Sequence, residues 1–110
     1  MNYAPILLFV YNRPEHTRRC IESLLRNPLV SESNLFIYAD GAKDCMQQEA
    51  VNEVRNYIHT LQGFKQITLI ERSKNWGLGR NIIDGVTSQV NLNGKVIVLE
   101  DDLVVAPYFL

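Results

Sequence analysis

The segment PILLFVYNRPEHTRRCIESLL, residues 5–25, joins a predicted strand to a predicted helix. Pro5–Tyr11 is a continuous run of strand-forming residues, which is typical of a strand that is buried on both faces. Pro14 suits the first turn of a helix, and Glu15 suits its positive end. The residues expected to face inward recur at helical spacing and are Thr17, Cys20, Ile21, Leu24 and Leu25. The segment therefore predicts the first half of a strand–helix–strand crossover.

The same alternation continues along the chain. Further strands are predicted at Asn34–Asp40, Gln66–Arg72 and Lys95–Glu100, and further helices at Asp44–Gly63 and Gly79–Val90. Strands that alternate with helices imply crossover connections and a mostly parallel sheet. We therefore predict a Rossmann-like α/β domain in three layers, α/β/α, with helices on both faces of the sheet. The pattern leaves the strand order open.

Local signals set the expected helix ends and faces. Asp44 and Gln47 read as a capping box, Gly63 as a helix end and Asn93-Gly94 as a turn. The second helix carries an apolar stripe formed by Ala50, Val51, Val54, Tyr57, Ile58 and Leu61. The third is expected to present Ile82, Ile83, Val86 and Val90 on one face.

Length and composition restrict the class of protein. The 110 residues suffice for one small domain, residues 1–110, and the formal net charge of −1 gives no pull toward nucleic acid or an anionic membrane. The longest apolar runs are too short to span a bilayer, so no transmembrane segment is expected. Cys20 and Cys45 match no metal-binding spacing, and we interpret them as reduced thiols of a cytoplasmic protein.

The sequence stops at APYFL, directly after an acidic cluster. We therefore expect an incomplete fold that leaves a sheet edge or an apolar face uncovered. Such a surface favours self-association.

Polar residues follow every predicted strand. The first strand leads into Asn12-Arg13, the second into Asp40-Gly41, the third into ERSKNWGLGRN (residues 71–81) and the fourth into Glu100–Asp102. In open α/β sheets, ligands bind beyond the carboxyl ends of the strands. The sequence therefore predicts one binding site for a polar, charged ligand at this edge of the sheet.

The acidic cluster lies within KVIVLEDDLVV, residues 95–105. If the chain stays extended, Glu100 and Asp102 share a face, and two such carboxylates suit a hard divalent cation such as Mg²⁺ or Mn²⁺. The alternative is a solvated loop with an acidic tip.

The two middle loops allow two interpretations each. Asp40 before Gly41 is either a turn former or a carboxylate that accepts hydrogen bonds from a ligand. The glycine-rich segment NWGLGRN opens a helix and suits an approaching phosphate, although it departs from the dinucleotide fingerprint. Arg80 is either a diphosphate ligand or a solvated side chain.

His16 and His59 are expected on helix surfaces. The sequence leaves open whether Trp76 belongs to the core or forms a lid over the site.

Four motifs in order resemble the nucleotide-sugar-binding half of GT-A-fold glycosyltransferases. They are PILLFVYNRPEHTRRCIESLL, IYADGA, NWGLGRNIIDGV and VIVLEDDLVVAPYFL. The form LEDDL followed by Pro-Tyr-Phe is most similar to the N-acetylglucosaminyltransferase I type. The resemblance covers essentially the whole chain and implies transfer of a sugar from a nucleoside diphosphate sugar, with a UDP-sugar favoured, to a saccharide or similar acceptor. It also implies that the protein could lie against a membrane through its acceptor.

The resemblance also implies site roles. Tyr11, Asn12 and Arg13 would flank the nucleotide base, and Asp40 would contact the base or ribose. Asn75, Gly77 and Arg80 would line the nucleotide-sugar pocket. Asp102 would bind Mn²⁺ or Mg²⁺, while Glu100 and Asp101 would contact ribose, sugar or metal-bound water.

No residue of this chain is a candidate for the catalytic base. In inverting relatives, the base and the acceptor pocket lie C-terminal to the acidic strand, so we expect a donor-binding half that is inactive alone. Two alternatives stay open. A nucleotidyltransferase would carry a glycine-rich basic loop after the first strand, where this chain has YNRPEH. A non-catalytic nucleotide-binding module would bind its ligand without metal.

Overall fold

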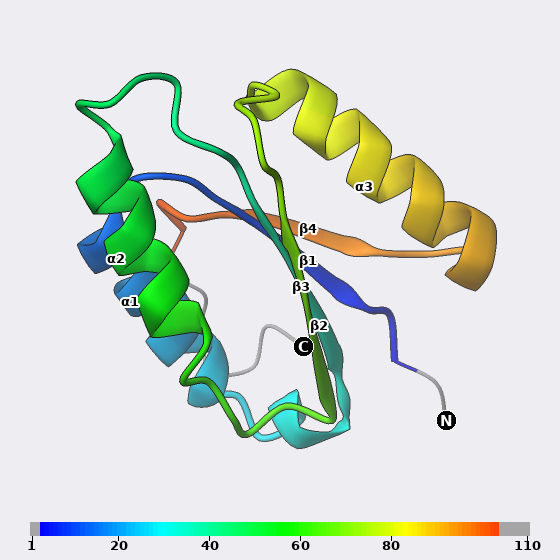
Figure 1. Ribbon diagram of the computed structural model, residues 1–110. Helices are drawn as coiled ribbons and strands as arrows, with labels where there is room; N and C mark the ends of the chain where they lie inside the picture. Colours follow the sequence, from blue (N-terminus) through cyan, green and yellow to red (C-terminus); the bar gives the residue numbers. More distant parts are fainter. Residues whose placement is uncertain (1–2, 104–110) are drawn as a thin grey trace.

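The computed structural model describes residues 3–103. Strands and helices alternate along the chain (Figure 1). The strands are β1 (Ile6–Val10), β2 (Asn34–Ala39), β3 (Gln66–Glu71) and β4 (Ile97–Glu100), and the helices are α1 (Pro14–Leu25), the short 3₁₀ helix η1 (Val30–Glu32), α2 (Gln48–Ile58) and α3 (Leu78–Asn93). The four predicted strands and the first predicted helix are confirmed, except for residues at the ends of each element.

The four strands form one parallel sheet in the order β3-β2-β1-β4. Ile6 of β1 is aligned with Leu35 of β2 on one side and with Ile97 of β4 on the other. The chain thus builds the sheet outward from β1 through β2 to β3, and then returns across β1 to add β4. This reversal makes the junction of β1 and β4 the topological switch point, where α/β sheets open a crevice for ligands.

Helices cover both faces of the sheet, so the predicted three-layer α/β/α arrangement is confirmed. Helices α1 and α2 lie side by side on one face, and α3 lies on the other (Figure 1). The α1–α2 side holds the larger core, in which Leu8, Ile21 and Val54 are fully buried. The α3 side holds a smaller cluster built on Leu7, Phe9 and Tyr38.

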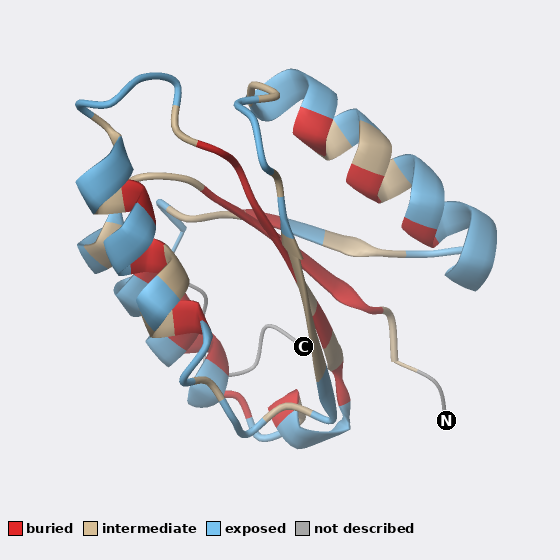
Figure 2. Ribbon diagram, viewed as in Figure 1, coloured by how far each residue is buried: buried red, intermediate tan, exposed pale blue. Residues whose placement is uncertain are grey.

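Strand β1 is buried along its whole length, because it lies between two strands and beneath helices on both faces (Figure 2). This burial explains why its sequence shows no polar alternation. The predicted apolar stripe of α2 is also confirmed: Val51, Val54 and Ile58 are buried, and Tyr57 and Leu61 pack against the larger core.

The predicted start of the second helix is wrong. Asp44 does accept the amide N–H groups of Met46 and Gln47, at 3.1 and 3.2 Å, but it closes a turn that precedes the helix. The helix α2 begins only at Gln48, because the side chain of Gln47 accepts a hydrogen bond from Asn12 instead of returning to cap the helix. The predicted end at Gly63 is also wrong: α2 stops at Ile58, and Gly63, with a positive φ of 102°, lies in the bend before β3.

The predicted inner face of the third helix is partly wrong. Ile82 and Val86 pack on the sheet, but Ile83 is 69% exposed and Val90 is 38% exposed. The face turned to the sheet contains Asn81, Gly85 and Gln89, all of which are buried. A polar residue was not expected there, but Gln89 Nε2 donates to the Tyr38 hydroxyl at 3.4 Å, which satisfies it. Gly94, with φ 78°, ends the helix as predicted.

Among residues 3–103, no helix is long and apolar enough to cross a membrane. Both described cysteines are free thiols, with Cys20 buried and Cys45 exposed. Residues 104–110, which include the Pro-Tyr-Phe part of the acidic motif, lie outside the described residues.

Candidate functional site

A cleft of about 350 Å³ opens at the carboxyl ends of the strands, next to the switch point between β1 and β4. It is lined by residues from all four strand-end loops, although these are far apart in the sequence. Nine of the residues predicted for a site line it, namely Tyr11, Asn12, Arg13, Asp40, Asn75, Gly77, Glu100, Asp101 and Asp102. The alternation of strands and helices predicted that these residues would share the carboxyl edge of the sheet. In the structure they line one cleft.

The loop after β1 is tied to the loop after β2. The Tyr11 hydroxyl accepts the amide N–H of Lys43 at 2.9 Å, and Asn12 Nδ2 donates to the side-chain oxygen of Gln47. Both loops line the cleft, so these bonds hold two parts of its lining together. Arg13, which is exposed, contributes a guanidinium beside the acidic cluster.

Asp40 and the loop 75–77 contribute a further part of the lining. Asp40 is only 5% exposed, and Asn75 Nδ2 donates to the carbonyl of Gly41 at 2.9 Å. Gly77 precedes the first residue of α3 with a positive φ of 82°, a conformation that glycine adopts without strain. The N-terminus of α3 thereby lies at the cleft, where the free amide groups of a helix favour an anion.

The acidic cluster forms the floor nearest the switch point. Glu100 is the last residue of β4 and lies level with Phe9 of β1. The chain does not stay extended here: the Leu103 amide N–H donates to the Glu100 carbonyl at 3.2 Å, so the chain turns at Asp101 and Asp102. A turn keeps all three acids close to the strand end instead of alternating them across the sheet.

The two aspartates of the turn differ in environment. Asp101 is half-buried, and Asp102 is exposed. Burial raises the pKa of the Asp101 carboxyl above its ordinary value, Arg13 and His16 oppose this shift, and Asp102 and Glu100 add to it. Within residues 3–103, no cluster of three or more His, Cys, Asp and Glu side chains is positioned to hold a metal ion alone.

The structure places Arg80 outside the lining of the cleft. Its guanidinium carbon lies 4.2 Å from the ring centre of Trp76, and that of Arg72 lies 3.7 Å from the same ring. Arg72 is also paired with Asp84 at 2.6 Å. Trp76, left open by the sequence, is thus a half-buried ring that contacts two guanidinium groups.

Lys43 and Asn81 line the cleft and were missed by the sequence analysis. Asn81 is 1% exposed, and its Oδ1 accepts a hydrogen bond from Arg72 Nε at 3.0 Å. Asn81 could have been predicted to line the cleft because it lies one turn into a helix that begins there. Lys43 lies in a loop without periodicity, so only its position after the second strand could have indicated it.

Comparison with known families agrees with this arrangement. The family model described as glycosyl transferase family 2 matches residues 6–110, which includes every element of the sheet. The chain belongs to glycosyl transferase family 2. No curated protein matches it. The cleft is therefore the candidate functional site of a family 2 domain, and the GT-A resemblance seen in the sequence is confirmed at the level of the family.

Proposed function

We propose that this family 2 domain binds a nucleoside diphosphate sugar, preferably a UDP-sugar, and that the sugar passes to a saccharide or similar acceptor. The observation that carries the proposal is the convergence of the three acids at the end of β4, the loop after β1 and the N-terminus of α3 on one cleft. Family membership favours this reaction over nucleotidyl transfer.

We propose that Asp102 is the protein ligand of Mn²⁺ or Mg²⁺. Its carboxylate is exposed at the cleft, and the remaining ligands would be phosphate oxygens and water, as is common for Mg²⁺ bound with a nucleotide. Bound there, the cation would offset the charge of the departing diphosphate. Glu100 and Asp101 would contact ribose, sugar or metal-bound water.

Positive groups of the chain would hold the rest of the donor. Arg13 and Lys43 line the same cleft as the acids and would face the diphosphate, together with the N-terminus of α3. Tyr11 and Asn12 would flank the base. Asn75 and Gly77 would line the nucleotide-sugar pocket, and Arg80 remains a predicted ligand from beside Trp76.

We also propose that this chain supplies donor binding without the catalytic base, which would come from outside the described residues. Its two free cysteines suit a reducing compartment such as the cytoplasm. Release of sugar or transfer by the purified chain alone would contradict the first of these proposals.

Calorimetry with UDP, with and without Mn²⁺, tests the proposal. We expect UDP binding that requires the metal and that Asp102→Ala abolishes, because the metal loses its protein ligand. Glu53→Ala is the matched control, since Glu53 is an exposed acid on α2 outside the cleft lining. Equal UDP binding in the presence of a chelator would contradict the proposal and favour a metal-independent nucleotide-binding module.

A further inference from the structure

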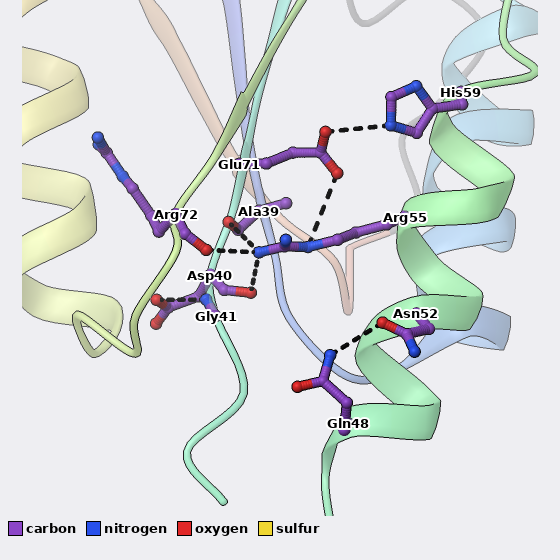
Figure 3. Close-up of polar contacts among 9 residues, drawn as sticks. All are labelled: Ala39, Asp40, Gly41, Gln48, Asn52, Arg55, His59, Glu71 and Arg72. Atoms are coloured by element: carbon purple, nitrogen blue, oxygen red, sulfur yellow. Dashed lines mark hydrogen bonds and ion pairs between the residues drawn. The ribbon is translucent and has the colours of Figure 1, made fainter. Parts of the chain in front are cut away.

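Arg72 joins the end of β3 to the first turns of α3. Figure 3 shows its backbone carbonyl turned toward Arg55 of α2, which donates to it at 2.7 Å, and its side chain pointing away from α2. On that side, Arg72 Nη2 donates to Asp84 Oδ2 at 2.6 Å, and Arg72 Nε donates to Asn81 Oδ1 at 3.0 Å. The Arg72 side chain is only 12% exposed. Two hydrogen bonds and burial therefore hold the guanidinium in one orientation.

The bond from Arg72 decides which end of the Asn81 amide is left for a ligand. An arginine side chain has donors only, so the amide must turn its oxygen toward Arg72 and its NH₂ group away from it. Asn81 lines the cleft and is only 1% exposed. Among residues 3–103, its Nδ2 atom has no hydrogen-bond acceptor, yet it is not one of the fully buried atoms that lack a partner. The NH₂ group is therefore an unpaired donor with access to the cleft.

The position of Asn81 in α3 directs this donor toward the end of the helix that lies at the cleft. Asn81 is the fourth residue of α3, and its backbone N–H donates to the carbonyl of Gly77 at 3.1 Å. The Cα–Cβ bonds of an α-helix tilt toward its N-terminus, so the side chain covers the first turn. Gly77 and Leu78 at that end also line the cleft. Since an unpaired N–H in such a buried position costs free energy, an acceptor oxygen of a bound ligand would complete the hydrogen bonding of the amide.

We propose that Asn81 donates an N–H to an acceptor oxygen of the bound nucleoside diphosphate, and that Arg72 is the positioning residue that keeps the amide in this orientation. Arg72 lies outside the lining of the cleft, so it acts through Asn81. Without Arg72, the amide is free to rotate and to turn its oxygen toward the ligand oxygen, which removes the hydrogen bond. The inference rests on the proposed function in one respect, namely that the ligand is a nucleoside diphosphate.

Asn81→Ala removes the donor and keeps a good helix former in α3. We expect calorimetry to show metal-dependent UDP binding weakened about 3- to 10-fold if the acceptor is a neutral oxygen of base or ribose, and about 10- to 100-fold if it is a phosphate oxygen. CDP and 2′-deoxy-UDP identify the oxygen, because a smaller loss with either one assigns the contact to the base or to the ribose, and equal losses assign it to a part that all three share.

Asn52→Ala is the matched control, since Asn52 is an exposed asparagine of α2 outside the cleft lining (Figure 3). Its affinity for UDP should be unchanged. Unchanged affinity of Asn81→Ala for all three nucleotides would overturn the proposal.

A double-mutant cycle tests whether Arg72 acts through Asn81. Arg72→Met should weaken UDP binding, but the double variant Arg72→Met/Asn81→Ala should bind UDP no more weakly than Asn81→Ala alone. The same cycle with Arg72→Lys, which keeps the charge but loses the fork of donors, decides the point if the Met variant does not fold. Losses that multiply in the double variant would show that Arg72 acts independently of Asn81 and contradict the proposal.

Nitrogen–proton NMR of the Arg72 side chain tests the orientation of the amide without any ligand. Because the Nε–H of Arg72 donates to Asn81, we expect this proton to exchange slowly with water in the unmodified protein and faster in Asn81→Ala. Unchanged exchange in the variant would overturn the proposal. If the unmodified protein binds no nucleoside diphosphate, the proposed function fails, and this measurement still decides whether Arg72 orients Asn81.

Discussion

Cys20 shows how one buried residue is linked to the acidic end of β4. Its Sγ lies 3.7 Å from the carbonyl oxygen of Glu100, and the side chain is fully buried. Burial, with smaller contributions from Asp101 and Asp102, raises the pKa of this thiol from 9.0 to about 12. The thiolate is therefore strongly disfavoured in the folded protein.

This shift predicts a loss of stability in alkali. The folded thiol holds its proton more tightly than the unfolded one, so the unfolding free energy falls as pH rises from the unfolded pKa of 9.0 toward about 12. We expect Cys20→Ala to flatten that part of the curve of melting temperature against pH, although it lowers stability at neutral pH by leaving a small cavity. Cys45→Ala, at an exposed site, serves as the control. An identical alkaline loss in all three proteins would contradict the prediction.

At the residue scale, the position of a side chain was predictable where the residue directly follows a strand of the parallel sheet. Asn12, Asp40 and Asp102 follow parallel strands, and such strands end at one edge whatever their order, so their convergence followed from the pattern. The partner of each side chain was not predictable. Arg80, in the first turn of α3, contacts Trp76, which lies in the preceding loop, and the path of that loop depends on three bonds to Asp40.

At the element scale, Gly85 decides how closely α3 approaches the sheet. A Cβ atom there would lie 3.0 Å from the ring carbons Cζ of Phe9 and Tyr38, which stack with centres 5.0 Å apart. This close approach also explains why the sequence predicted the wrong residues of α3 to face the sheet. Periodicity locates the large apolar residues, but here the closest point of contact is a residue without a side chain.

The pair Gly85→Ala and Gly79→Ala tests this packing within one helix. At Gly79 a Cβ meets nothing within 4 Å, so the change should raise stability by up to about 1 kcal/mol through helix propensity. At Gly85 the same gain should be outweighed by overpacking of about 1–3 kcal/mol against two buried rings. Urea unfolding of both variants measures the difference. Equal stabilisation by the two changes would contradict the close contact.

At the scale of the whole molecule, the class and layers of the fold were predictable because strand and helix periodicities alternate without interruption. The strand order was not, since the return of the chain across β1 leaves no trace in local sequence. Among the described residues, β4 pairs with β1 alone, and its other edge carries no strand. Val98 on that strand is 39% exposed.

The free edge of β4 predicts self-association of the isolated chain. Unpaired backbone groups beside an exposed apolar residue form a template for a second copy. We expect sedimentation velocity to show association that rises with concentration and that Val98→Lys reduces, because a charge on an edge strand opposes pairing. Thr87→Lys, which adds the same charge to the exposed surface of α3, should not reduce it. A monomer at every concentration would contradict the prediction.

The pairing of Ile6 with Ile97 also sets an order of assembly during synthesis. Strands β1 to β3 can pair as soon as they leave the ribosome, whereas β4 must close a loop that spans nearly the whole domain. The acids that complete the cleft therefore reach their places last. A nascent chain would expose the flank of β1 until then, and a nucleotide could be captured only after the final strand had been added.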